Sequence, residues 1–261
     1  MNNIKELLKV QYKNYVRKHN KFVFTHVPKC AGSALSQSLL QGLYPSIVRN
    51  SPLTTGIDIK HAREISKTLA FDEQKIREVL LVSFLESKKK IFITGHCYAN
   101  PSVVSKYGSD WNFITVLRDP IDRFVSEYVY NTFKSEKWKN NSLPLGDYLN
   151  GDEARASSIT YARFFSGMTN HEILESPREA VKRSINNLKN FYKVGFLDEL
   201  SAWVNELNDE FNSDIRINKT NSSPNSEAFR AITDSKNKME TIRQMCEIDC
   251  EIYKELRNLK K

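Results

Sequence analysis

The chain has 261 residues, which is enough to bury a substantial core in one large domain or two small ones. Hydrophobic residues make up 40% and aromatic residues 11%, as in ordinary soluble globular proteins, and no apolar run is long enough to cross a membrane. The formal net charge of +8 favours an anionic partner, such as a nucleotide, an acidic glycan or a nucleic acid.

The first twenty residues lack the apolar h-region and the cleavage site of a signal peptide. They have the pattern of a basic amphipathic helix, which we expect to pack against the domain, with peripheral contact to a membrane surface as the alternative. The missing export signal predicts a cytoplasmic protein, unless a membrane anchor has been trimmed away. The four cysteines include no C-x-x-C pair, so in a reducing compartment we expect free thiols.

In the first half of the chain, short apolar runs alternate with longer helical patterns. The predicted elements are a strand at 22–27, a helix at 32–43, a helix at 72–87, a strand at 91–94, a strand at 112–117 and a helix at 120–133. Asp72 can cap the second helix, whose apolar face is expected to carry Val79. Pro120 fits the first turn of the third helix.

The second half continues the alternation. Its predicted elements are a helix from 177 to about 188 that begins with a capping box at Ser176–Glu179, a strand at 191–195, an amphipathic helix over 197–207, a candidate fifth strand at 214–218 and one helical tail from about 235 to 261. Segments 44–61 and 134–151 are expected to be loops. This order predicts one α/β domain over 1–261, with a P-loop-like parallel sheet of about four to five strands and helices on both faces.

The stretch Pro28-Lys29-Cys30-Ala31-Gly32-Ser33 joins the first predicted strand to its helix. Ligands of open α/β sheets bind beyond the carboxyl ends of the strands. Gly32 permits close backbone approach, the helix start offers N–H groups and partial positive charge, and Lys29 adds a full charge. Together with the Ser33 hydroxyl, these groups predict a phosphate cradle. The lysine precedes the glycine, so this is not a Walker A loop; an ordinary βα turn is the alternative.

The stretch LRDPIDRFVSEY follows the third predicted strand and runs into a helix. Arg118 lies at the strand end and Ser126 comes eight residues later, while Arg123 shares a helix face with Ser126. An arginine fork with a nearby hydroxyl suits a second, separate phosphate. The alternative is a local salt bridge from Arg118 to Asp119 or Asp122.

A histidine follows the second predicted strand in TGHCYAN, residues 94–100. The pKa range of histidine suits a general base near neutral pH, although a lone histidine is often structural. Glu127 is an alternative base, and His26 is expected to lie inside the first strand and point into the core. Because Lys29, His96 and Arg118 each follow a strand, we expect them along one edge of one sheet.

These motifs resemble those of the PAPS-dependent sulfotransferases, specifically the Golgi-type carbohydrate sulfotransferase family that includes heparan sulfate 2-O-sulfotransferase and bacterial relatives. HVPKCAGSAL resembles the family's 5′-phosphosulfate loop and LRDPIDRFVSEY its 3′-phosphate motif. The tail IDCEIYKEL is similar to a family pattern of Asp followed by an aromatic residue. The resemblance is strongest over residues 22–130, and segment 44–90 contributes nothing to it.

The resemblance implies a role for each matching residue. Lys29 is expected to hold the 5′-phosphosulfate of PAPS and to act in catalysis, together with a loop whose members are Cys30, Ala31, Gly32, Ser33 and Ala34. Arg118 and Ser126 would hold the 3′-phosphate, and His96 would be the catalytic base. Thr220 would belong to a loop that closes over the nucleotide. Ala34 stands where relatives often carry a second hydroxyl, which leaves the backbone cradle unchanged.

The predicted reaction is in-line transfer of a sulfuryl group from PAPS to an acceptor hydroxyl, with no metal. Cys246 and Cys250 have a spacing that suits metal ligands but suits a core face of a helix better. The alternatives are a divergent P-loop kinase, a basic nucleic-acid-binding module and an inactive nucleotide-binding protein. The first lacks its Walker A lysine, and the second lacks a basic stripe with interleaved aromatic residues.

The acceptor is expected to be a glycan rather than a nucleic acid. The basic residues of segment 134–165 suit an acidic or a neutral saccharide, and they are Lys134, Lys137, Lys139, Arg155 and Arg163. A lipid-linked glycan and a small metabolite are the alternatives.

Overall fold

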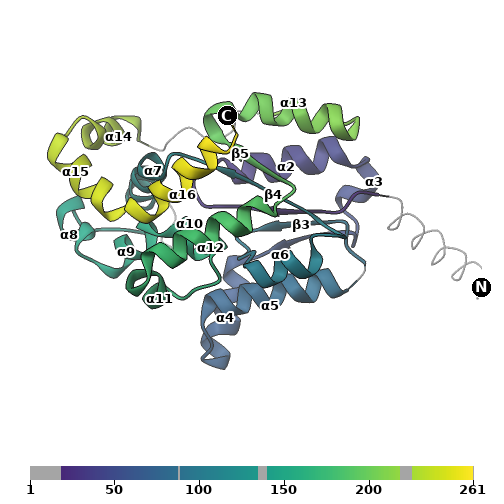
Figure 1. The fold of residues 1–261 in the computed structure, drawn as a ribbon, viewed down its shortest axis with the longest axis horizontal. Helices are drawn as coiled ribbons and strands as arrows, with labels where there is room; N and C mark the ends of the chain where they lie inside the picture. The colour runs from purple at the N-terminus through teal and green to yellow at the C-terminus, as the bar shows by residue number, and fades with distance from the viewer. Residues whose placement is uncertain (1–18, 88, 135–139, 218–224, 261) are drawn as a thin grey trace, which may run out of the picture.

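A parallel β-sheet of five strands forms the centre of the protein (Figure 1). The structure is a computed structural model that describes residues 19–87, 89–134, 140–217 and 225–260. The strands are β1 (Phe22–Thr25), β2 (Thr54–Ile57), β3 (Phe92–Gly95), β4 (Asn112–Leu117) and β5 (Lys193–Phe196), in the spatial order β2-β3-β1-β4-β5. All four pairings are parallel, so every strand ends at the same edge.

The strands are apolar on both sides, which explains why helices cover both faces. Along β1, Phe22 and Phe24 pack into one hydrophobic cluster while Val23 packs into another. This period-two alternation is typical of a strand that is buried on both faces. The predicted α/β fold with a parallel sheet is therefore confirmed.

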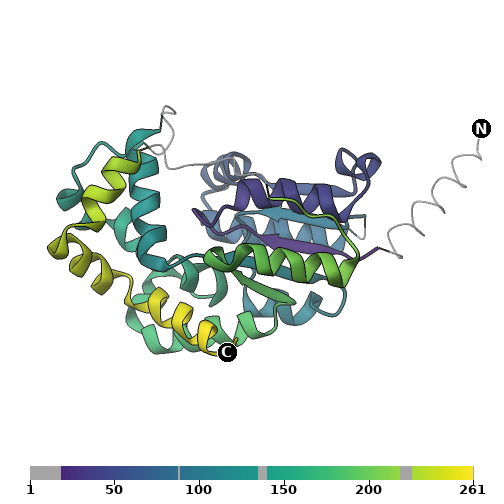
Figure 2. The same cartoon turned by 90° about the horizontal axis from the view of Figure 1, so that it is seen from above.

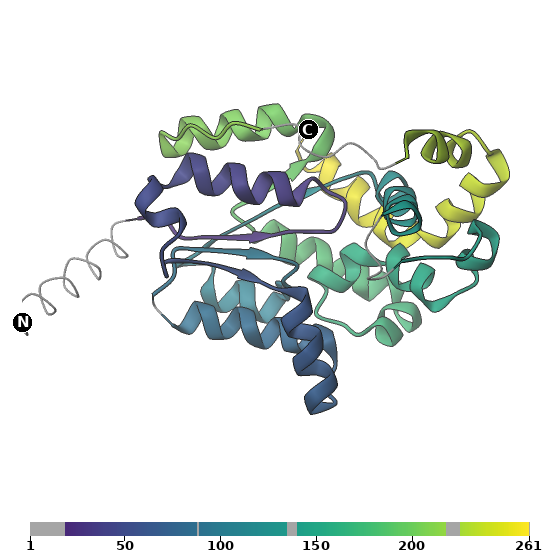
Figure 3. The ribbon, with the colours of Figure 1, turned by 180° about the vertical axis from the view of Figure 1, so that it is seen from behind.

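The helices form two layers around the sheet and a third group beyond one end of it (Figures 1 and 2). Their bounds are α2 (Gly32–Leu43), α3 (Ser46–Arg49), α4 (Ile59–Leu69), α5 (Glu73–Glu86), α6 (Pro101–Tyr107), α7 (Pro120–Phe133), α8 (Leu145–Leu149), α9 (Asp152–Ser158), α10 (Thr160–Phe165), α11 (Asn170–Glu175), α12 (Pro177–Lys189), α13 (Leu200–Phe211), α14 (Ser226–Thr233), α15 (Lys236–Met245) and α16 (Glu247–Asn258), with a 3-10 turn at Leu197–Glu199. Helices α2 and α13 cover one face, and α5, α6 and α12 cover the other (Figure 3).

Strand β2 lies in a segment for which the sequence predicts a loop. Strand β2 falls within segment 44–61 and forms an edge of the sheet next to β3. Its sequence, TTGI, has one large apolar residue because an edge strand is only partly covered. The prediction of a strand at 214–218 is wrong for its described part, residues 214–217, where Ile215 instead packs into the core beside α13.

Three smaller expectations also differ from the structure. Segment 134–151 contains α8, and the tail is two helices that meet at Cys246. The tail bends because Ile242 packs with α7 whereas Ile252 packs in the core beside the sheet. Val79 is 63% exposed, so it is not on the buried face of α5.

The capping box predicted at Ser176–Glu179 does not form among the described residues. Ser176 also caps the C-terminus of the preceding helix, α11, where its N–H donates to the carbonyl of Glu172. A capping box is present one helix earlier, where the side chain of Thr169 accepts from the Glu172 N–H and the Glu172 carboxylate accepts from the Thr169 N–H.

Within the ranges that the structure describes, no helix is long and apolar enough to cross a membrane. The basic N-terminal segment lies outside the described residues except for positions 19 and 20, and the interpretation of its role stays a prediction.

Candidate active site

The three polar clusters that the sequence singles out lie along one edge of the sheet. Thr25, the last residue of β1, pairs with Gly95 on one side and with Thr115 on the other. The loops that follow β1, β3 and β4 carry Lys29, His96 and Arg118, so these residues extend from three adjacent strands. This is the carboxyl edge, where open α/β sheets bind their ligands.

The loop between β1 and α2 exposes the start of the helix. Lys29 and Ala31 have φ angles of 64° and 57°, which lie in the left-handed region that non-glycine residues seldom occupy. The first hydrogen bond of α2 runs from the N–H of Leu35 to the carbonyl of Ala31 at 3.0 Å. The N–H groups of residues 32–34 therefore come before the helical ladder and are directed out of the helix end, where the helix dipole favours an anion.

Gly32 has a specific steric role at this turn. A Cβ atom at position 32 would lie 1.6 Å from Cδ2 of His26, so the helix start can pack against the histidine ring only with glycine at this position. His26 follows β1 rather than lying inside it, and its ring sits between Gly32 and His96.

The ammonium group of Lys29 lies against an aromatic ring of α7. Its Nζ is 3.7 Å from the ring centroid of Tyr130, and Nζ of Lys134 is 5.5 Å from the same centroid. Burial lowers the pKa of Lys29 to about 8; the Glu127 carboxylate opposes this shift, and the charge of Arg118 adds to it. Lys29 and Arg118, predicted from separate motifs, are therefore close enough to interact electrostatically.

Arg118 lies at the junction of β4 and α7. The Asp119 carboxylate caps the helix by accepting from the N–H groups of Ile121 (3.0 Å) and Asp122 (3.1 Å), and Pro120 occupies the first helical position. The guanidinium of Arg118 is 4.0 Å from the Asp122 carboxylate, which is the local salt bridge weighed as an alternative. At that separation and exposure the pair contributes little, and Arg118 can exchange it for a phosphate.

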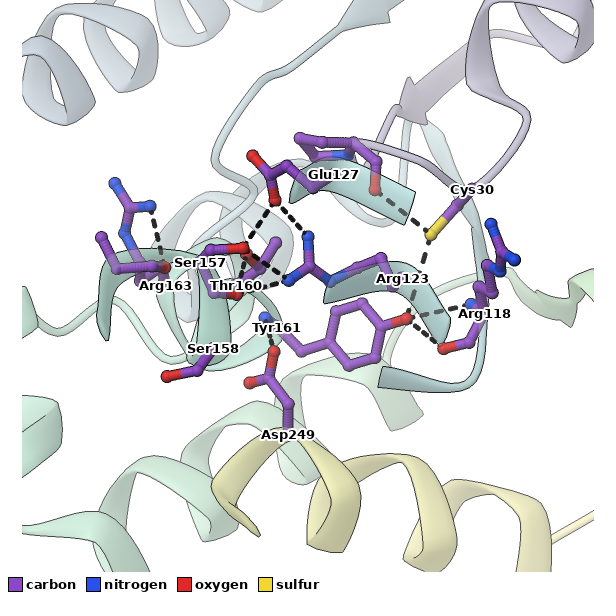
Figure 4. A network of polar contacts seen from close by, with 12 residues as sticks. Cys30, Arg118, Arg123, Glu127, Ser157, Ser158, Thr160, Tyr161, Arg163 and Asp249 are labelled. Atoms are coloured by element: carbon purple, nitrogen blue, oxygen red, sulfur yellow. Dashed lines mark hydrogen bonds and ion pairs between the residues drawn. The ribbon is translucent and has the colours of Figure 1, made fainter. Parts of the chain in front are cut away.

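Ser126 lies farther along α7 and is largely buried. Arg123, predicted to share a helix face with Ser126, is fully buried. It donates to the Glu127 carboxylate at 2.6 Å and to the carbonyl and hydroxyl oxygens of Ser157 (Figure 4). Arg123 is therefore a structural residue. The sequence could not show this, because the side of α7 that faces inward depends on the distant helix α9.

Glu127, the alternative base, is part of the same buried network. Its carboxylate accepts from Arg123 and also from the hydroxyl of Ser157 at 2.8 Å. These two charge-assisted hydrogen bonds hold the carboxylate inside the network. The role of Glu127 as the alternative base stays a prediction.

His96 follows Gly95 at the end of β3. Its Nδ1 is 2.7 Å from the carbonyl oxygen of His26, which can only accept, so Nδ1 carries a proton and the lone pair of the neutral ring lies on Nε2. The two imidazole rings stack with centroids 4.2 Å apart. Burial lowers the pKa of His26 well below its ordinary value, and the charges of His96 and Lys29 lower it further. The ring of His26 is thus neutral, and His96 is contacted by both this ring and the main-chain carbonyl of His26.

Cys30 lies in the loop between β1 and α2 and is buried. Its thiol contacts the carbonyl of Pro28 at 3.6 Å and the hydroxyl of Tyr161 at 3.9 Å. Burial raises the pKa of Cys30 to about 11, so the side chain is an uncharged thiol that packs, and only its backbone could contact a ligand. Thr220 lies outside the described residues and its predicted role stays a prediction.

Among the residues that the structure describes, no group of three or more His, Cys, Asp or Glu side chains could hold a metal ion. Cys246 and Cys250 pack with Ile242 and Val129 in the hydrophobic cluster around α7, which agrees with their interpretation as core residues.

The family model described as the sulfotransferase family matches residues 13–254 of this chain. The chain belongs to the sulfotransferase family. The match includes segment 44–90, which carries no recognisable motif, and it agrees with the family predicted from the two loops. Membership makes this sulfotransferase an enzyme of a PAPS-dependent family, and it decides against the kinase and the nucleic-acid-binding module.

The sulfotransferase is also similar to a solved structure, the crystal structure of a sulfotransferase from Alicyclobacillus acidocaldarius. The two chains are 14% identical; the similarity covers 88% of this chain and 96% of that one, with a TM-score of 0.43. No curated protein matches the sequence.

Two residues that the sequence does not single out, Tyr130 and Tyr161, contact predicted site residues. Tyr130 lies under Lys29, and Tyr161 contacts Cys30 and Arg118. Tyr130 is four positions after Ser126 on the helix predicted at 120–133, so helical spacing could have found it. Tyr161 has no such local signal.

Proposed function

We propose that this sulfotransferase binds PAPS across the loops that follow β1 and β4 and transfers its sulfuryl group in line to a saccharide hydroxyl. The observation that carries the proposal is that two positive charges, Lys29 before α2 and Arg118 before α7, lie close together at the carboxyl edge of the sheet. Two separate sites of positive charge on one sheet edge suit a ligand with two separate anionic groups.

The donor set at the first loop fits a phosphosulfate. It comprises the Lys29 ammonium, the N–H groups at the start of α2 and the Ser33 hydroxyl, none of which requires a metal ion to attract an anion. When bound, PAPS supplies the sulfuryl group, and negative charge grows on the leaving phosphate as the S–O bond breaks. Lys29 and the helix start stabilise that charge without moving, because the loop holds them in place beforehand.

His96 would accept the proton of the acceptor hydroxyl at Nε2. The hydrogen bond from Nδ1 to the His26 carbonyl supports this role, because it fixes the tautomer in which Nε2 can take a proton. After transfer the ring would be an imidazolium, and that hydrogen bond to a carbonyl would become stronger.

Three features support a saccharide as the acceptor. The net charge of +8 favours anionic ligands, Lys134 lies beside Lys29, and the Tyr130 ring next to both is 37% exposed. Exposed aromatic rings offer flat apolar surface with a polar tip, which suits sugar rings. Turnover of PAPS should be measured with a panel of acidic glycans, neutral glycans and small alcohols. Turnover with the small alcohols alone would contradict the saccharide proposal.

PAP, the nucleotide that remains after transfer, should bind much more tightly than AMP, which lacks the 3′-phosphate. The charge-assisted contact from Arg118 is worth about 1.5–3 kcal/mol, which corresponds to a preference of about 10-fold to 150-fold. Titration calorimetry with both nucleotides measures it. Arg118→Ala should remove the preference, whereas the surface control Arg183→Ala should keep it. Equal affinities of the unmodified enzyme for PAP and AMP would contradict the assignment of the 3′ site.

The affinity for PAP should fall as the pH rises through about 8. The free enzyme loses the Lys29 proton in that range, because its pKa is about 8, whereas a bound anion favours the protonated form. Binding at about pH 8.5 should therefore take up a proton, which calorimetry detects in buffers of different ionisation enthalpy. Lys29→Arg, which stays charged, should bind without this uptake. The same uptake in that variant would assign the proton to another group.

A further inference from the structure

The hydroxyl of Tyr161 contacts both proposed anion-binding loops, which are the loop between β1 and α2 and the loop between β4 and α7 (Figure 4). It accepts a hydrogen bond from the main-chain N–H of Arg118 at 2.9 Å and donates one to the carbonyl oxygen of the same residue. The Cys30 thiol of the first loop lies 3.9 Å from the same hydroxyl. One phenol thus contacts both the residue after Lys29 and the residue that would hold the 3′-phosphate.

Tyr161 is itself held by the neighbouring helix α16. It lies in α10, is fully buried, and has its N–H bonded to the Asp249 carboxylate of α16 at 2.8 Å. The same carboxylate accepts from the N–H of Ala162 at 3.1 Å, so α16 fixes the start of α10. Burial raises the pKa of the Tyr161 hydroxyl well above its ordinary value, so the hydroxyl keeps the proton that it donates.

We infer that Tyr161 is a positioning residue for the nucleotide: its hydroxyl fixes the main chain at Arg118 relative to the Cys30 loop, and so sets the separation between the two anion sites. The inference rests on the proposed role of Arg118 at the 3′-phosphate. The N–H and the carbonyl of Arg118 both bond to the Tyr161 hydroxyl. Without this hydroxyl the main chain at Arg118 could rotate, which would change the distance between the guanidinium and the loop after β1. A preorganised site avoids the cost of this ordering when the ligand binds.

Tyr161→Phe tests the inference, because it removes only the hydroxyl. We expect the affinity for PAP to fall about fivefold to tenfold, as for the loss of one neutral hydrogen bond, and the affinity for AMP to change less than about twofold. The ratio of the PAP affinity to the AMP affinity is the readout, because a purely structural defect would weaken the binding of both nucleotides by the same factor. In the Arg118→Ala background the same substitution should leave the ratio unchanged.

Tyr44→Phe is the matched control. Tyr44 is also buried, and its hydroxyl contacts the main-chain carbonyls of Asn20 (2.7 Å) and Ile91 (2.9 Å), both of which precede strands at the opposite edge of the sheet. It should lower the melting temperature by an amount comparable to Tyr161→Phe and keep the PAP-to-AMP ratio of the unmodified enzyme. A ratio that falls equally in both variants would overturn the inference.

The outcomes separate this inference from the proposed function. If the unmodified enzyme binds PAP and AMP equally, the 3′ site has been misassigned. If it prefers PAP and Tyr161→Phe keeps the full preference, the 3′ site stands and the positioning role is wrong. Should Tyr161→Phe not fold, Asp249→Asn provides a second test through the start of α10. That variant should lower the ratio in the same direction, and an unchanged ratio in the folded variant would overturn the inference.

Discussion

Replacing His96 by alanine should lower kcat by about 10²-fold to 10⁴-fold and leave the affinity for PAP nearly unchanged. The ring nitrogen that would accept the acceptor's proton is fixed by the Nδ1 contact to the His26 carbonyl, so the variant loses a positioned base and no contact to the nucleotide. Single-turnover kinetics measures the loss in the chemical step, and calorimetry measures PAP binding.

The pH profile gives a second readout for His96. The acid limb of kcat/KM should report an ionisation in the histidine range for the free enzyme and should disappear in His96→Ala. His171→Ala is a suitable control, because His171 is exposed on α11 and pairs with Glu175. A His96→Ala enzyme that keeps most of its kcat and the same acid limb would remove His96 from the mechanism and make Glu127→Gln the next variant to test.

The positions of Lys29, His96 and Arg118 could be predicted from the sequence because each depends on a local rule. Each residue follows a short apolar strand, and parallel strands end at one edge, so a parallel sheet places all three on that edge. The strand order β3-β1-β4, which the sequence does not predict, makes them neighbours. The edge strand β2 could not be predicted in the same way. As an edge strand, β2 has a neighbouring strand on one side only and is partly exposed. It therefore contains few apolar residues, and its sequence resembles that of a loop.

The inner part of the site follows from packing that no local pattern encodes. Arg123 is three positions before Ser126, but α9 covers its side of α7, so it became a buried partner of Glu127 and Ser157. Tyr161 meets Arg118 across 43 positions of sequence, and its own anchor, Asp249, is 88 positions farther on. Helical periodicity reaches only three or four residues, so it cannot place either contact.

Lys29→Ala should lower turnover by about 10²-fold to 10³-fold, the range for one preorganised transition-state contact, with a smaller loss in PAP affinity. The lysine is worth more in the transition state because charge on the leaving phosphate grows as the S–O bond breaks, while the start of α2 still binds the ground state. Lys134→Ala is the matched control: its ammonium lies 5.5 Å from the Tyr130 centroid, against 3.7 Å for Lys29, and its loss should be smaller.

The stability of the Lys29 variant distinguishes a functional lysine from a structural one. Burial lowers the pKa of Lys29 to about 8, so below that pH the folded state holds a charge that it disfavours, and Lys29→Met should melt at the same or a higher temperature than the unmodified enzyme at pH 7. Between about pH 8 and 10.5 the unfolded lysine binds more protons than the folded one, so the unmodified enzyme gains stability and the difference should shrink. If Lys29→Met is less stable than the unmodified enzyme at pH 7, Lys29 is a structural residue. If Lys29→Ala folds and keeps full turnover, the phosphosulfate binds at another loop.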